Sequence, residues 1–169
     1  MINDRVMIRM SLAWLGEIHE MLGEYDEANR QYEESLLTAQ GNGDLAGTAT
    51  AWLNLGRLNV SLGKVYQAKS YLRAGLKLAR EFHYQPLIVD GLISMALLLV
   101  QQGHKQRALE VLIPALNHPA GEPQMRARAE QILARLTDTP LAEILSQIEA
   151  TTPLETVVAE LLTFNLPAS

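Results

Sequence analysis

The sequence predicts an all-α fold of three antiparallel helix pairs that repeat with a period of 40, followed by C-terminal capping helices. The first observation behind this prediction is composition. The chain is 48% hydrophobic but only 5% aromatic, and its apolar part is mostly Leu and Ala, which lose little conformational freedom in a helix. The second is an internal repeat, in which Leu15-Gly16, Leu55-Gly56 and Met95-Ala96 align at equal offsets.

Five further sets of positions keep the same register. They are Leu12, Trp52 and Leu92; Gly23, Gly63 and Gly103; Ala28, Ala68 and Ala108; Tyr32, Leu72 and Leu112; and Leu36, Leu76 and Leu116. A Gly can adopt the left-handed conformation that ends a helix, so each unit is predicted as helix, Gly, helix. The small residues at 16, 56 and 96 let the paired helix approach, and the bulky residues at 32, 72 and 112 fill the space between the two.

Breaks in the apolar pattern separate the units and the C-terminal elements. Gly41-Asn42-Gly43 interrupts the helices, and Asp44 is suited to cap the next one. After the break at residues 118–123, a helix is expected from about Gln124 to Leu136. Thr139-Pro140 and Thr152-Pro153 predict two more helix starts. Their apolar stripes are Leu141, Ile144, Leu145 and Ile148, then Leu154, Val157, Val158, Leu161 and Leu162.

We therefore expect a repeat array over residues 1–137 and C-terminal helices over 138–169. Repeat stacks need a terminal cap over their open end, which is one role for the C-terminal helices. The alternative role is dimerisation between two copies of the chain.

Composition argues against several classes of function. A net charge of −5 without a Lys or Arg run argues against direct nucleic-acid binding. The absence of Cys excludes disulfides, zinc–thiolate sites and cysteine nucleophiles. The four His residues form no metal-binding pair, and no apolar stretch suits a signal peptide or a membrane span. We expect a cytoplasmic protein that is not an enzyme and uses no cofactor.

The segments WLGEIHEMLGEYDEA, NLGRLNVSLGKVYQA and SMALLLVQQGHKQRA resemble the tetratricopeptide repeat signature. The resemblance covers three units over about residues 9–120, although Ala96 replaces the usual Gly in the third. It implies a right-handed α-solenoid. The common unit of that family has about 34 residues, so six extra residues per unit are expected in the second helix or in the links. The longer unit is similar to the arrays of bacterial maltose-regulator-type transcription activators and signalling ATPases.

The resemblance implies that the first helix of each unit lines a concave groove. The matched groove positions are Ala13, Trp14 and Glu17; Leu53, Asn54 and Arg57; Ile93, Ser94 and Leu97; and, extending the row, Met10, Thr50 and Asp90. Family members that clamp a C-terminal carboxylate place Lys where this chain has Ala13, Leu53 and Ile93. That clamp is therefore absent.

Several of these residues have two interpretations. Arg57 could bind a carboxylate or phosphate through its fork of donors, or pair with Glu17 or Asp90. Asn54 could bind a peptide backbone or be an exposed helix residue. Trp14 and Trp52 are interpreted as packing anchors more readily than as ligand platforms. The apolar set of Leu53, Ile93, Leu97 and Val100 could be a groove floor or inter-repeat core.

Two functions follow. The leading hypothesis is a protein- or peptide-binding scaffold, favoured by a groove open along its length. The alternative is a small-molecule-sensing or regulatory module, favoured by a closed pocket with polar groups around Arg57.

Overall fold

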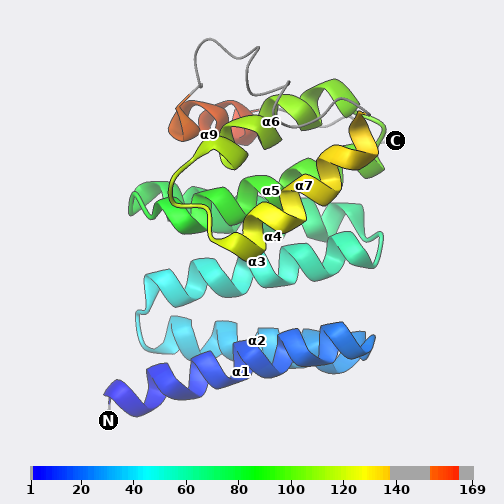
Figure 1. Cartoon of the computed structure of the whole chain (residues 1–169). Coiled ribbons are helices and arrows are strands. Elements are labelled where there is room, and N and C mark those ends of the chain that lie inside the picture. Colours follow the sequence, from blue (N-terminus) through cyan, green and yellow to red (C-terminus); the bar gives the residue numbers. More distant parts are fainter. Residues whose placement is uncertain (1, 138–152, 164–169) are drawn as a thin grey trace.

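The computed structural model describes residues 2–137 and 153–163, and every regular element in these ranges is a helix (Figure 1). The helices are α1 (Ile2–Leu22), α2 (Tyr25–Gly41), α3 (Leu45–Ser61), α4 (Val65–Glu81), α5 (Gln85–Gln101), α6 (Lys105–Asn117), α7 (Pro123–Leu136) and α9 (Leu154–Thr163). The predicted all-α fold is confirmed. None of the described helices is long and apolar enough to cross a membrane.

Consecutive helices pack as antiparallel pairs, α1 with α2, α3 with α4 and α5 with α6. Figure 1 shows the pairs stacked in chain order, from the blue pair to the green one. The first helices also contact one another in sequence, α1 with α3 and α3 with α5, and α5 contacts α7 in turn, whereas α2 and α4, like α4 and α6, have no extensive direct contact. The array therefore has the first helices on its more closely packed, inner side.

The turns between the first six helices share one geometry. A residue with positive φ recurs at every twentieth position, at Gly23, Gly43, Gly63, His83 and Gly103. In each turn the amide after this residue donates to a carbonyl five residues earlier, at 2.8–2.9 Å, as in a Schellman motif. Three of the glycines were expected. The other two positions, Gly43 and His83, lie in the links between units. These links therefore have the same structure as the turns within each unit.

This turn geometry also explains the period. The helices α2, α3, α4 and α5 are equal in length, at seventeen residues each, and the links between them are only three residues long. The additional length relative to the common unit therefore lies in the helices, the first of each pair as well as the second. It does not lie in the links, which were one of the two places expected.

In the first two pairs, the contact between the helices depends on a glycine facing a bulky side chain. A Cβ on Gly56 would lie 2.6 Å from Cδ2 of Leu72, and one on Gly16 would overlap the ring of Tyr32. Both distances are too short for a real contact, so only glycine fits. The predicted roles of these two pairs of positions are confirmed.

Asp44 joins the first unit to the second. Its Oδ1 accepts the Gly47 amide at 2.8 Å, which confirms the predicted N-cap of α3. Its Oδ2 lies 2.8 Å from Nε of Arg9 on α1. One carboxylate therefore caps a helix and forms an ion pair with the preceding unit.

The buried apolar residues form two clusters of unequal size. The smaller one joins α2 and α3 and contains Ala28, Tyr32, Leu55 and Leu58. The larger one runs from α3 to α9 and includes Leu53, Leu72, Leu92, Leu112 and Val158 among many others. The core is thus concentrated in the second and third units and the C-terminal helices.

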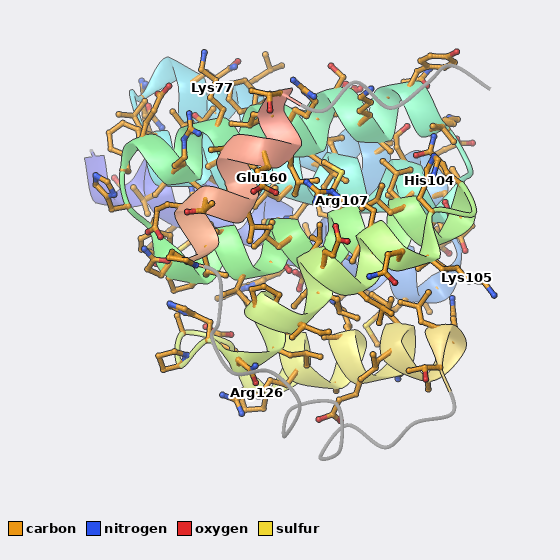
Figure 2. All side chains as sticks on the ribbon, turned by 90° about the horizontal axis from the view of Figure 1, so that it is seen from above. Lys77, His104, Lys105, Arg107, Arg126 and Glu160 are labelled. Atoms are coloured by element: carbon orange, nitrogen blue, oxygen red, sulfur yellow. The ribbon has the colours of Figure 1, made fainter. Side chains whose placement is uncertain are left out.

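The last described helix, α9, folds back onto the second and third units, beside α6 in Figure 1, and contacts α4, α5 and α6. Its apolar stripe of Leu154, Val157, Val158 and Leu161 is buried. Arg73 of α4 donates to two carbonyls in the last turn of α9, those of Leu161 and Leu162. Arg107 of α6 contacts Glu160 at 3.0 Å, and Figure 2 shows these two side chains side by side. The predicted helix start at Thr139-Pro140 and the stripe from Leu141 to Ile148 lie outside the described residues.

Candidate functional site

The sequence-predicted groove residues fall into exposed and buried groups. On α1, Met10, Trp14 and Glu17 are exposed, and Trp14 is 59% exposed. The interpretation of Trp14 as a packing anchor is therefore wrong, because α1 has no helix before it in the described array. Trp52 is half-buried, and Thr50 donates its hydroxyl to the carbonyl of Ala46 within α3.

The predicted groove residues on α3 and α5 divide equally. Leu53, Asn54, Ile93 and Ser94 are buried, and Thr50, Arg57, Asp90 and Leu97 are half-buried. Leu53 is 1% exposed and belongs to the larger core cluster, which corresponds to the inter-repeat interpretation of this residue. Asn54 is buried as well, and its Oδ1 lies 3.5 Å from Nη2 of Arg57. The interpretation of Asn54 as an exposed helix residue is therefore wrong. Ile93 and Ser94 of α5 are also buried, as is Ala13 of α1, while Leu97 and Val100 are half-buried against the core.

Arg57 lies at the centre of a three-residue network between α1, α2 and α3. Its Nη1 is 2.9 Å from Oε2 of Glu20, and its Nη2 donates to the hydroxyl of Tyr32 at 3.1 Å. That hydroxyl in turn donates to Glu20 at 3.0 Å. The ion-pair partner of Arg57 is thus Glu20 and neither Glu17 nor Asp90, because Glu20 lies one helical turn after the expected position.

Burial and neighbouring charge set the protonation of this network. Burial raises the pKa of Tyr32 above its usual range, so its hydroxyl stays protonated. Burial alone would lower the pKa of Arg57, but the Glu20 carboxylate, with Tyr32 and Asp90, raises it. The guanidinium therefore stays charged and is held in one orientation.

Asp90 has a different partner from the one expected. It forms an ion pair with Arg128 of α7. Because α7 lies outside the repeat register, no pattern in the sequence indicated this partner.

A cavity of about 230 Å³ opens beside Arg57 on the side of the first helices. Its lining combines one set of polar and one set of apolar side chains from α1, α3, α5 and α7. The polar residues are Glu20, Arg57, Ser61, Ser94, Arg128, Gln131 and Arg135, and the apolar residues are Ile93, Leu97 and Ile132. Of the predicted groove positions, Arg57, Ile93, Ser94 and Leu97 meet here, while Met10, Trp14, Glu17, Thr50, Leu53, Asn54 and Asp90 do not line it.

One wall of the cavity, which the sequence analysis did not predict, belongs to α7. Its residues Arg128, Gln131, Ile132 and Arg135 have the i, i+3, i+4, i+7 spacing of one helical face. That spacing is visible in the sequence. It did not indicate a part of the site, because the repeat register ends before α7.

The described residues contain no group of three or more His, Asp or Glu placed to hold a metal ion. The chemistry that the cavity offers is instead binding, through guanidinium and hydroxyl donors beside an apolar wall.

The comparisons with known proteins agree with the helix pairs of the first half. The family model described as the tetratricopeptide repeat matches residues 7–81, which span most of α1 and all of α2, α3 and α4. No curated protein and no solved structure matches the chain. The repeat is confirmed over this span, and domains of this kind generally act as protein-interaction scaffolds. The predicted similarity to maltose-regulator-type activators and signalling ATPases has no support in these comparisons.

Proposed function

We propose that the chain is a non-catalytic scaffold that binds a protein or peptide segment along the face of α1, α3, α5 and α7. The observation that carries this proposal is the cavity around Arg57, since the first helices of all three units and α7 contribute to it. Stacked repeats commonly bind partners on the surface that runs across successive units. A segment crossing this face would contact every unit and place one side chain in the cavity.

The size of the cavity favours a peptide side chain over a larger free ligand. Its volume of about 230 Å³ is below the range of about 300–1,000 Å³ for pockets that enclose drug-sized molecules. The second candidate function, a module that senses a small molecule, is favoured by the convergence of polar groups on Arg57. A ligand for that function would have to be a small anion.

The C-terminal region has a proposed role in the same scaffold. Since the apolar stripe of α9 is buried against α4, α5 and α6, we propose that residues 138–169 act as a cap. Dimerisation through the apolar stripe of α9 would require this helix to separate from α4, α5 and α6.

The binding proposal is tested with peptides selected from a displayed decapeptide library on the wild-type protein. Leu97→Asp places a charge at the cavity wall, whereas Leu37→Asp places one on an exposed position of α2. We expect Leu97→Asp to weaken binding about tenfold or more and Leu37→Asp to leave it unchanged. Circular dichroism of both variants checks that they remain folded.

Two results would contradict the proposal. One is a library that yields no peptide above background. The other is a folded Leu97→Asp variant that binds the selected peptides as well as the Leu37→Asp control does.

A further inference from the structure

We infer that the cavity beside Arg57 recognises the carboxylate of a Glu or Asp side chain within the bound segment. This inference rests on the proposed function and names the chemistry of its partner. It stands on the charge of the cavity, on an unsatisfied donor within it and on the shape of its walls.

The cavity is positively charged in a chain that is negatively charged overall. Three guanidinium groups line it, from Arg57, Arg128 and Arg135, against one carboxylate, from Glu20. The chain as a whole has 19 acidic and 14 basic residues. The local excess of cations therefore reflects the site and not the composition.

The three arginines are not equivalent. Arg57 is paired with Glu20 and Arg128 with Asp90, whereas Arg135 is exposed and has no ion pair within residues 2–137 and 153–163. The charges of the two paired arginines are balanced by their carboxylates, so Arg135 supplies the net positive charge of the cavity and remains able to bind an anion. A carboxylate matches the planar donor fork of a guanidinium.

Ser94 supplies a second, independent indication of a ligand. It is 3% exposed and lines the cavity, yet its Oγ has no hydrogen-bond partner among the described residues. A Ser within a helix commonly donates to the carbonyl four residues earlier, and a buried hydroxyl without any partner is unfavourable. A turn of the Ser94 side chain toward the cavity would let this hydroxyl donate to an acceptor oxygen of a ligand there.

The remaining wall is apolar. Ile93 and Leu97 of α5 and Ile132 of α7 form it, so they suit the methylene groups that carry a side-chain carboxylate. This arrangement differs from a clamp built on Lys at positions 13, 53 and 93, where the chain has Ala13, Leu53 and Ile93.

The test uses decapeptide pools with amidated C-termini, so that no terminal carboxylate is present. One central position is fixed as Glu, Gln or Lys, and binding is measured by fluorescence anisotropy. We expect the Glu pool to bind about tenfold more tightly than the Gln pool, and the Lys pool to bind least. Arg135→Gln and Ser94→Ala should each reduce the preference for Glu over Gln. The matched control is Arg126→Gln, which removes an exposed guanidinium of α7 that does not line the cavity.

The outcomes separate the inference from the proposed function. Equal binding of the Glu and Gln pools, abolished by Leu97→Asp, would overturn the inference and leave the scaffold function intact. Binding of no pool would overturn both. Glutarate added as a free dicarboxylate tests the other source of the same chemistry. Saturable glutarate binding that Arg135→Gln removes, without binding of any pool, would assign the site to a free small carboxylate and overturn a peptide partner.

Discussion

His83 occupies a backbone position that the other four turns fill with glycine. Its φ is 53°, and its side chain is exposed. A residue with a Cβ is less stable than glycine in the left-handed region by about 1–2 kcal/mol. The turn between α4 and α5 is therefore the one strained member of the five described turns.

We expect His83→Gly to stabilise the protein. The gain should be about 0.5–1 kcal/mol, since the relief of strain is partly offset by the greater entropy that glycine gives the unfolded chain. Urea denaturation followed by circular dichroism measures it. The control is Gly63→Ala, at the equivalent turn position with φ of 67°, which should destabilise the protein by about 1 kcal/mol. A destabilised His83→Gly variant would indicate that the imidazole contributes a contact that outweighs the strain.

The close approach of α3 and α4 depends on Gly56. We expect Gly56→Ala to destabilise the protein by about 1–3 kcal/mol, because the added Cβ would overlap Leu72 and lie 3.1 Å from its backbone nitrogen. Gly41→Ala is the matched control, since a Cβ at Gly41 meets nothing within 4 Å. It should be neutral or slightly stabilising. The free energies of unfolding of the two variants would be equal if helix propensity alone decided the effect.

Single residues also show what the sequence could and could not predict. The pairing of Gly16 with Tyr32 followed from size and register, because both are properties of sequence spacing. The pairing of Arg57 with Glu20 did not. Glu17 and Glu20 lie three residues apart on α1, and only the rotation of α1 against α3 decides which of the two meets Arg57.

At the scale of the helix, α1 exposes a face that its counterparts bury. Ile8, Leu15 and Ile18 are exposed. The residues at the same positions of the second unit, Thr48, Leu55 and Leu58, and of the third, Ile88, Met95 and Leu98, are all buried. The difference arises because α3 and α5 pack against the preceding pair, and no described helix precedes α1.

This difference in burial predicts that truncation to Ala affects stability unequally at Ile18 and Leu58, which occupy the same position of the repeat. Leu58→Ala should destabilise the protein by about 2–5 kcal/mol, because Leu58 is fully buried. Ile18→Ala should change stability by less than about 0.5 kcal/mol, because Ile18 is 52% exposed. Thermal unfolding of both variants at several protein concentrations provides the comparison. A large, concentration-dependent loss for Ile18→Ala would mean that another molecule covers α1 in solution.

The helix α7 explains why the cavity could be only half predicted. Arg57, Ile93 and Leu97 lie on helices that the repeat register identified, so their side of the cavity was expected. The opposite wall comes from a helix that follows the break at residues 118–123 and has no repeat partner in the sequence. Its position depends on packing against α5 and α6, which no local pattern encodes.

Across the whole molecule, the buried apolar contacts are distributed unequally between the first unit and the rest of the described chain. The smaller cluster, of four buried residues, joins α2 to α3. Among the described side chains of α1, the buried residues are the small Ala13 and Gly16. The larger cluster ties α3, α4, α5, α6, α7 and α9 together. In a repeat array, stability is close to a sum of such neighbour contacts.

We therefore expect α1 and α2 to open at a lower free energy than α3, α4 and α5. Native-state hydrogen exchange measured by mass spectrometry should show faster exchange for peptides from residues 4–41 than for those from 45–101, after correction for intrinsic rates. Equal protection in both regions would mean that the array unfolds as one cooperative unit, which would contradict the division of the core.

The contact between Arg73 and the end of α9 spans 88 residues of chain. A ribosome adds about 5–20 residues per second, so α4, which ends at Glu81, is complete about 4–16 s before Leu161 of α9 has been added. During that interval the first two units can already stack, while the surface reserved for Val157 and Leu161 stays open to water. The order of synthesis thus leaves the apolar surface of α4 uncovered until the chain is nearly complete.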